Sequence, residues 1–335
     1  MTFEDSTLAV ANVADIDDVP MTPEGHHTPA DRLFRGLSTA AACVSLLIVG
    51  STLLFLILKA RPAFAHSGVI DFFTTSIWNP TVGRFGVLGL LVGTLIIATV
   101  AMVIAVPLGI GMALFINEYA PARLRGPLTS IVDLLAALPS LLFGMWALFA
   151  LQKHLTPVAS FLSVHLSALP FFRVSTDAGV PTSSALSASS FIAGCVVAIM
   201  ILPIITSVTR DVMAQVPREQ CEGALALGGT RWGMIREVIL PFARGGIVGA
   251  SLLGFGRALG ETIAVALIIS PTISANTQIL KTGASSVAAY IAIHFGEAGP
   301  LERSGLVAAG LALFLLTLIV NLLARLIVVR KAAPR

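Results

Sequence analysis

Two charged residues, Arg257 and Glu261, lie four positions apart inside the apolar stretch GFGRALGETIAV at positions 254–265. A spacing of four places both side chains on one face of a helix. Counted from Gly245, where the apolar run begins, Arg257 lies about 18 Å along such a helix, just beyond the middle of a hydrocarbon core of about 30 Å. A charged group at that depth faces a protein interior or a watery path.

Two interpretations of this pair are open. In the first, Arg257 and Glu261 form an internal salt bridge that fixes helix packing. In the second, the guanidinium of Arg257 offers its forked donors to an oxyanion that crosses the membrane, and Glu261 holds the arginine in position and keeps the empty site from trapping anions too tightly. Glycines at positions 249, 254, 256 and 260 keep the helix thin, so neighbouring helices and a ligand can approach closely.

The elements that carry this pair are membrane-spanning helices. The chain has 335 residues, of which 56% are hydrophobic and 12% are charged, against about 25% charged in a soluble domain. The charges cluster between apolar runs long enough for a helix to cross a bilayer. These runs do not alternate as the strands of a β-barrel do, and no clustered basic face suits nucleic acid. The composition therefore predicts an all-α integral membrane protein.

Six apolar runs predict six transmembrane helices, at about 36–58, 84–118, 128–151, 188–209, 245–269 and 304–324. Pro139 is expected to bend the third of them. The segments 152–186 and 271–303 read as polar loops. Residues 1–31 hold seven acids and no Lys or Arg, which predicts a disordered acidic tail ahead of one membrane domain over residues 32–335.

The distribution of basic residues predicts the orientation of these helices. With both termini inside, the inner segments hold thirteen Lys or Arg and the outer segments hold seven. Because Lys and Arg gather on the cytoplasmic side, both termini are expected in the cytoplasm. Asp133, near the inner start of the third span, is either paired with Arg123 or Arg125 or serves as a gate element.

The cytoplasmic connection over residues 210–244 contains VPREQCEGALALGGTRWGMIREVILP at 216–241. Pro217 suits the start of a helix, and Gly228 and Gly229 suit its end, because glycine accepts a left-handed turn. Thr230 is expected to cap a second helix that Pro241 ends. The pattern predicts two short helices that meet at a glycine corner. The alternative is an amphipathic hairpin lying on anionic lipid.

No pattern points to catalysis or to a cofactor. The chain has no GxxxxGK[ST] motif and no Gly-Lys pair, so ATP hydrolysis by this chain is not expected. Cys43, Cys195 and Cys221 lack metal-ligand spacing and read as small core residues. The histidines at positions 66, 154, 165 and 294 are scattered, and we expect neither a metal nor a cofactor.

The glycine corner resembles the EAA loop of ABC importer permeases. The matching residues are Glu222, Ala224, Gly228 and the VILP sequence at 238–241, whereas Gly223 stands where the family has alanine. The resemblance implies that this loop docks into a groove on a separate ATP-binding subunit. It also implies that Glu222, Ala224 and Gly228 are the coupling residues.

The sequence GRALGETIAV at 256–265 resembles the fifth-span motif of the PstC family, permease subunits of phosphate-specific ABC importers. WNP at 78–80, GTLIIA at 93–98, PLGIGMALFINEYAP at 107–121 and LAALPSLLFGMWAL at 135–148 agree with the same family, so the resemblance covers nearly everything from residue 35 onward. Ala264 and Val265 favour this family over the sister PstA family.

This resemblance implies a type I ABC importer permease (MetI-like) fold in a bacterial inner membrane. It implies that phosphate passes Arg257 and Glu261. The implied partners are a PstA-like permease, two PstB-like ATP-binding subunits and an extracytoplasmic PstS-like phosphate-binding protein.

Two other functions remain open at this point. A permease of the same class for sulfate, molybdate or another oxyanion fits the same residues, because phosphate is indicated only by resemblance. An ion-driven secondary transporter would use Glu261 as a proton site, but it would not need the glycine corner.

Overall fold

The computed structural model describes residues 29–174, 183–269, 272–273 and 276–332. Positions 1–28 of the predicted acidic tail lie outside the described residues. The chain divides into two units, one ending at Thr52 and the other beginning at Leu53. The described part of the first unit belongs to helix α1 (Pro29–Ser67), whose last residues belong to the second unit.

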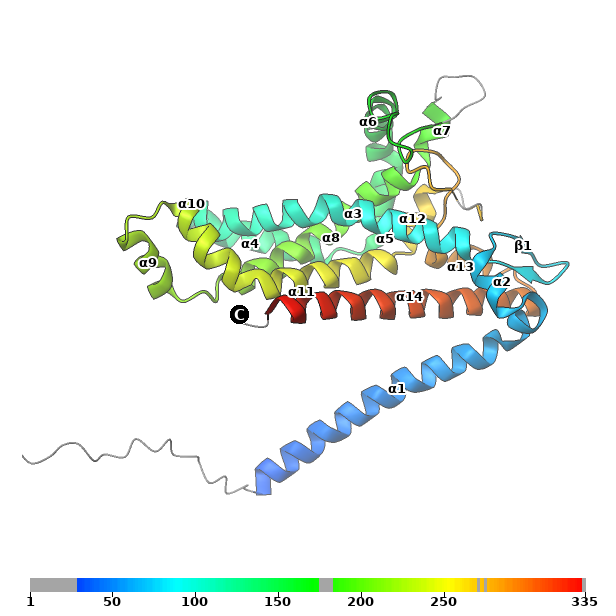
Figure 1. The fold of residues 1–335 in the computed structure, drawn as a ribbon, viewed down its shortest axis with the longest axis horizontal. Helices are drawn as coiled ribbons and strands as arrows, with labels where there is room; N and C mark the ends of the chain where they lie inside the picture. The colour runs from blue at the N-terminus through cyan, green and yellow to red at the C-terminus, as the bar shows by residue number, and fades with distance from the viewer. Residues whose placement is uncertain (1–28, 175–182, 270–271, 274–275, 333–335) are drawn as a thin grey trace, which may run out of the picture. The chain divides into compact units, whose positions relative to one another are not determined.

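The second unit is built almost entirely of helices (Figure 1). Three short π-helical segments, labelled η, extend or precede α-helices. After α1 the elements are α2 (Val69–Thr74), β1 (Trp78–Asn79), β2 (Arg84–Phe85), α3 (Leu88–Leu114), η1 (Phe115–Tyr119), α4 (Ala122–Ala137), α5 (Ser140–Trp146), η2 (Ala147–Leu151), α6 (Gln152–His165), α7 (Ser183–Ser187), α8 (Ser190–Met213), α9 (Arg218–Ala226), α10 (Arg231–Met234), η3 (Ile235–Ile239), α11 (Leu240–Leu259), α12 (Ile263–Ile268), α13 (Val287–His294) and α14 (Pro300–Ala332).

Helices of membrane-spanning length account for most of the described residues. Five segments are long and apolar enough: Pro29–Ser67, Leu88–Tyr119, Ser190–Met213, Arg231–Leu259 and Pro300–Ala324. A sixth is the pair Ala122–Ala137 and Ser140–His165, which is bent by 92°. The backbones of Leu138 and Pro139 are extended at the bend, because a proline disfavours the helical conformation of the residue before it. The all-α prediction and the bend at Pro139 are confirmed, and six spans result when the bent pair counts as one.

The segment after the third span is more regular than the sequence suggested. Residues 152–165 form α6, directly after η2, whereas a polar loop was expected over 152–186. Ala159 of α6 packs in a small buried cluster with Leu186 and Leu280. The loop prediction is wrong for α6 because apolar residues spaced among its polar ones bury one side of the helix.

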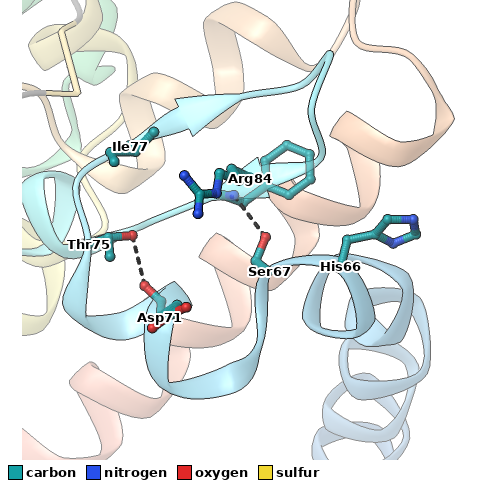
Figure 2. Close-up of a pocket in the computed structure, with 7 residues that line it drawn as sticks. His66, Ser67, Asp71, Thr75, Ile77 and Arg84 are labelled. Carbon is teal, nitrogen blue, oxygen red and sulfur yellow. Dashed lines mark hydrogen bonds between the residues drawn. The ribbon is translucent and has the colours of Figure 1, made fainter.

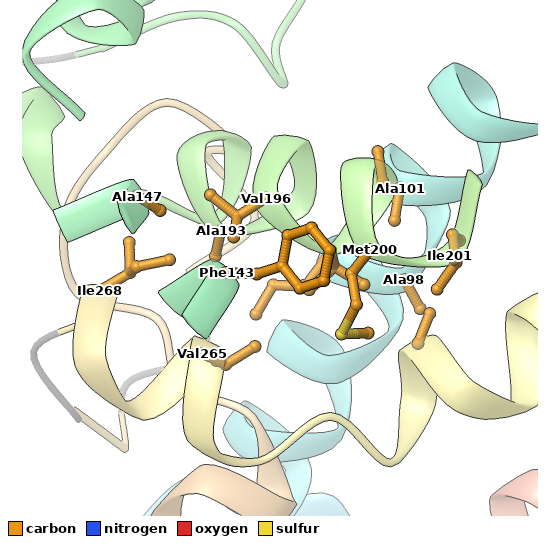
Figure 3. Close-up of a cluster of buried hydrophobic side chains, with 14 of the residues drawn as sticks. Ala98, Ala101, Phe143, Ala147, Ala193, Val196, Met200, Ile201, Val265 and Ile268 are labelled. Atoms are coloured by element: carbon orange, nitrogen blue, oxygen red, sulfur yellow. The ribbon is translucent and has the colours of Figure 1, made fainter. Parts of the chain in front are cut away.

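Small residues allow α3, α8 and α11 to pack closely against one another. Figure 3 shows part of this core, where Ala193, Val196 and Met200 lie around the ring of Phe143. A Cβ added to Gly194 would lie 2.6 Å from Cγ1 of Val100, so alanine there would push two helices apart. Close approach of this kind is how membrane helices gain packing energy.

A short hairpin lies at one end of the second unit, and α9 and α10 lie at the other (Figure 1). Trp78 of β1 pairs with Phe85 of β2. The Trp78 ring packs edge-on against Phe85 at 5.0 Å and against Tyr290 at 5.4 Å between centroids. Gly83, with φ +69°, supplies the left-handed residue of the turn.

Candidate functional site

The predicted glycine corner is present between α9 and α10. Helix α9 follows Pro217 and ends at Ala226, and Gly228 has φ +84°. The amide of Gly229 donates to the carbonyl of Ala224 at 3.2 Å, which closes the end of the helix. The Thr230 hydroxyl accepts from the amide of Gly233 at 3.1 Å and caps α10.

The corner has a buried side and an exposed side. Cys221 and Ala224 pack against a buried cluster that contains Met213, at the end of α8, and Ile235 of η3. Glu222, Leu225 and Trp232 are exposed. The exposed fraction of Leu227, next to the turn, is 91%. Large apolar side chains gathered at an apex mark a surface that meets another protein or a membrane.

The sequence predicted that the second helix of the corner ends at Pro241, and this prediction is wrong. The helix continues from Arg231 to Leu259 as one segment of 29 residues. The π-helical turn η3 comes directly before α11, and the amide of Leu240 donates to the carbonyl of Ile235. Pro241 stands in the first turn of α11, where the missing N–H costs no hydrogen bond after the wide π turn.

The pKa of the Cys221 thiol is raised by its surroundings at the corner. Partial burial raises the pKa of its thiol, and the nearby carboxylates of Glu118 and Glu222 raise it further. Glu118 belongs to η1, so the end of α3 and helix α9 bring their negative charges to the same place. The thiol is therefore held in its protonated form.

The fifth span is broken where the sequence predicted a continuous helix. Helix α11 ends at Leu259, Gly260 follows it, and α12 begins at Ile263. Glu261 lies in the break and is 7% exposed. Its Oε1 accepts a hydrogen bond from the amide of Ala264 at 3.2 Å, so the carboxylate caps the first turn of α12.

Arg257 and Glu261 do not share one helical face, because the helix ends between them. Arg257 is exposed in the last turn of α11. It forms no ion pair with any residue that the structure describes, Glu261 included. The salt-bridge interpretation of the pair therefore does not hold in this arrangement.

One face of α11 is left open around Arg257. Gly254 packs so closely on Ile205 of α8 that a Cβ would lie 2.8 Å away, whereas a Cβ on Gly249 or Gly256 would meet no atom within 4 Å. Leu253, on the same side as these two glycines, is exposed. The described residues thus cover one side of α11 and leave bare the side that carries Arg257.

Asp133 has a different partner from the one expected. The Nη2 atom of Arg210, in the last turn of α8, lies 3.7 Å from its Oδ1, and the hydroxyl of Ser207 donates to the same oxygen at 2.8 Å. Arg125 instead donates through Nε to the carbonyl of Ala120. Sequence spacing could not reveal the Arg210 pair, since it joins helices α4 and α8.

A cavity of about 230 Å³ with a mixed polar and apolar lining opens beside the hairpin (Figure 2). The Ser67 hydroxyl accepts from the amide of Phe85 at 2.8 Å, and Thr75 donates to the carbonyl of Asp71 at 2.8 Å. The sequence pointed to no residue of this cavity. The lining residues are His66, Ser67, Asp71, Thr75, Ile77, Arg84 and Phe85.

The two sets of predicted site residues lie near opposite ends of one long helix, Arg231–Leu259. Arg231, directly after the corner, and Arg257 are joined by uninterrupted helix, which spans about 39 Å at 1.5 Å per residue. The structure thus brings Glu222, Ala224 and Gly228 together at the corner. It keeps Arg257 and Glu261 at the other end of α11.

Named proteins of similar sequence match most of the chain. The chain is 39% identical over 302 residues to the phosphate transport system permease protein PstC of Xylella fastidiosa, which covers 90% of this chain and 91% of the relative. It is 40% identical over 301 residues to the phosphate transport system permease protein PstC 2 of Mycobacterium tuberculosis, with 89% and 91% covered. The resemblance to the PstC family is confirmed.

Solved structures of ABC transporters share the fold. The structure of a bacterial alginate ABC transporter in complex with an alginate pentasaccharide-bound periplasmic protein has a TM-score of 0.59 at 17% identity, covering 92% of this chain and 99% of that chain. A second one, of a bacterial ABC transporter that imports the acidic polysaccharide alginate, has a TM-score of 0.57 at 17% identity, with 90% and 100% covered. The expected importer permease architecture is confirmed at the level of the fold.

The family model described as "Binding-protein-dependent transport system inner membrane component" matches residues 105–332. This range runs from the middle of α3 through the corner and the break to α14. The chain therefore belongs to the family of binding-protein-dependent transport system inner membrane components, as a membrane permease component and not an enzyme.

Proposed function

We propose that this chain is the permease subunit of an ATP-driven importer of inorganic phosphate. Two relatives at 39% and 40% identity are phosphate transport system permeases by name. The observation that carries the proposal is the exposed guanidinium of Arg257, unpaired among the described residues, at the broken end of a spanning helix. Such a group forms charge-assisted bidentate hydrogen bonds with phosphate oxygens.

The break lets the two charges act separately. Arg257 lies in the last turn of α11, where the helix dipole favours a cation, and the Glu261 carboxylate lies at the first turn of α12, where it favours an anion. Each charge is stabilised by its own helix end, so Arg257 keeps its donors for a passing anion. Discontinuous helices recur at the substrate sites of transporters near the bilayer midplane.

The bare face of α11 supports a path shared with a second, PstA-like permease. Gly249, Leu253, Gly256 and Arg257 are spaced so that they share one side of the helix, and this chain leaves that side uncovered. A guanidinium facing lipid would be costly. A second permease packed on this face would enclose Arg257 in a path between the two subunits.

The glycine corner would dock on one of two PstB-like ATP-binding subunits. Its exposed apex carries Glu222 and Leu227, and Ala224 on the inner side packs against the rest of the chain. Gly228 gives the turn its left-handed residue. Motion of the ATP-binding subunit would thus reach α10, η3 and α11 through Glu222, Ala224 and Gly228.

The same assignment orients the chain. The corner over residues 210–244 would lie in the cytoplasm together with both termini and the acidic tail 1–31, and the hairpin would face the extracytoplasmic side. The excess of Lys and Arg on the corner side supports this orientation. A PstS-like binding protein would deliver phosphate at the hairpin end, and the path would open alternately to the two sides.

Uptake of radiolabelled phosphate tests the function directly. Cells with and without this chain are compared at low micromolar phosphate, with excess unlabelled sulfate or molybdate as competitors. We expect chain-dependent uptake that only unlabelled phosphate reduces. Loss of the signal to sulfate or molybdate, or uptake that does not depend on the chain, would contradict the phosphate assignment and leave the family membership intact.

A further inference from the structure

Arg210 lies in the last turn of α8, away from the site proposed around Arg257, and its side chain contacts two carboxylates. Its side chain is 12% exposed. The guanidinium makes its shortest contact with Asp211, its neighbour in sequence, at 2.8 Å from Nη2 and 3.2 Å from Nε. The carbonyl of Arg210 accepts from Nδ2 of Asn117 at 2.9 Å, which ties the end of α8 to η1.

The contact of Arg210 with Asp133 is different in kind, because it joins two helices. Asp133 lies on α4, and Nη2 of Arg210 stands 3.7 Å from its Oδ1. Ser207, one turn before Arg210, donates to the same Oδ1 at 2.8 Å and also accepts from Nη2 at 3.4 Å. The carboxylate of Asp133 is therefore held by two side chains of α8.

This contact lies between the corner and the bend. Helix α8 ends at Met213, which packs in the same cluster as Cys221 and Ala224 of the corner. On the other helix, Asp133 precedes the Leu138–Pro139 bend by about one and a half turns. A displacement of the corner that moves the last turn of α8 therefore acts on the arm formed by α4 and α5 through Asp133.

The geometry also suits a contact that opens and closes. At 3.7 Å the Arg210–Asp133 pair is at the outer limit of an ion pair, and the Asp133 side chain is 47% exposed. A half-exposed pair of this kind is worth about 1 kcal/mol or less. When Asp133 leaves, Arg210 retains the shorter bonds to Asp211, so the guanidinium is never without a carboxylate.

We propose that Asp133, Ser207 and Arg210 form a latch that couples movement of the corner to the α4–α5 arm. Closed, the latch holds α4 against the last turn of α8 in the resting transporter. Open, it releases α4 so that the path can change the side to which it is open. This inference rests on the proposed function, because it assigns a coupling role within the transport cycle.

The test uses the full importer, with both permeases, the ATP-binding subunits and the binding protein, in proteoliposomes. ATP hydrolysis is measured without binding protein, and phosphate uptake with it. In Asp133→Asn we expect hydrolysis without binding protein to rise about fivefold, since losing the ion pair shifts the resting equilibrium by about that factor. Uptake per ATP should fall. Asp133→Glu, which keeps the charge, should behave like the wild type.

Asp211→Asn is the matched control, because it removes the neighbouring negative charge from the same guanidinium without touching α4. Asp211 is the carboxylate that stays with Arg210 when the latch opens, so this change does not favour opening, and we expect ATP hydrolysis without binding protein to be no higher than in the wild type. The latch would be refuted if Asp133→Asn kept normal coupling or if Asp211→Asn uncoupled to the same extent. If the wild-type importer took up no phosphate, the substrate assignment would fall, whereas the hydrolysis comparison would still decide the latch.

A covalent version of the latch gives a second readout. The double variant Asp133→Cys with Ser207→Cys places two thiols where the native side chains touch. Oxidation should cross-link α4 to α8 and stop uptake, and a reductant should return uptake to the level that the double variant shows before oxidation, whereas each single variant should be insensitive to oxidation. Normal uptake by the cross-linked importer, or failure of the pair to cross-link, would overturn the proposal.

Discussion

Arg257 and Glu261, four residues apart in sequence, are separated by the end of α11: Arg257 lies in the last turn of this helix, and Glu261 lies in the break before α12. Arg257 is exposed at the end of α11, and Glu261 is buried and caps α12 through the amide of Ala264. In the proposed site, the carboxylate therefore fixes the backbone at the break and does not neutralise the guanidinium.

Arg257→Gln should reduce phosphate uptake to background while leaving the protein in the membrane. The side chain is exposed and unpaired in the described structure, so its loss should change the free energy of unfolding by less than about 0.5 kcal/mol. Initial uptake rate and membrane abundance are the measurements. Arg244→Gln, an exposed arginine on the same helix, is the control and should transport normally. Normal uptake by Arg257→Gln would remove Arg257 from the path.

Glu261→Ala and Glu261→Gln should separate the structural and electrostatic roles of this residue. Alanine removes the cap on α12 and should lower the stability of the protein by about 1 kcal/mol. Glutamine retains an oxygen that can accept from Ala264, so we expect a melting temperature close to that of the wild type. Thermal unfolding in detergent measures both. Equal destabilisation by the two variants would argue against the cap.

Gly228→Ala should impair uptake, and Gly223→Ala should not. Gly228 has φ +84°, where alanine costs about 1 kcal/mol and turns the corner away from its native direction. Gly223 lies inside α9 with no atom within 4 Å of an added Cβ, so alanine there should stabilise the helix by about 0.5–1 kcal/mol. Co-purification of the ATP-binding subunit and uptake are measured together. Similar behaviour of the two variants would contradict the role of the turn.

The thiol of Cys221 should react faster with iodoacetamide when Glu222 loses its charge. Burial raises the pKa of this thiol first, and Glu118 and Glu222 raise it further. The thiolate is the nucleophile, so below the pKa the rate follows the thiolate fraction, and Glu222→Gln should increase the rate by lowering the pKa. Mass spectrometry of the Cys221 peptide across pH 7–9 gives the rates. Arg236→Gln is a control that leaves both carboxylates in place. An unchanged rate would mean that Glu222 does not act on Cys221.

Features encoded by nearby residues could be predicted from the sequence. The apolar runs indicated the spans, Pro139 indicated the bend, and Gly228 and Thr230 indicated the corner and its cap, because each effect acts within one or two turns of chain. The resemblance to permeases added the function, which composition alone could not supply.

Features that depend on tertiary contacts were missed. Nothing local in GRALGETIAV distinguishes a glycine inside a helix from one at a break, and Gly260 and Glu261 form the break in the folded chain. Pro241 continues a helix because a π turn precedes it. The partner of Asp133 comes from a helix 74 residues further along the chain, at Ser207, and from Arg210 beside it.

The uninterrupted helix from Arg231 to Leu259 has a mechanical consequence. One end of the helix is at the corner, and Arg257 is about 39 Å away near the other end. A rotation of the helix about the corner therefore displaces Arg257 more than it displaces residues closer to the corner. A tilt of about 5° about the corner would swing the guanidinium sideways by roughly 3 Å, about the length of one hydrogen bond. A helix tilt this small, produced by a docked ATP-binding subunit, would be enough to move a bound anion from one set of hydrogen-bond donors to the next.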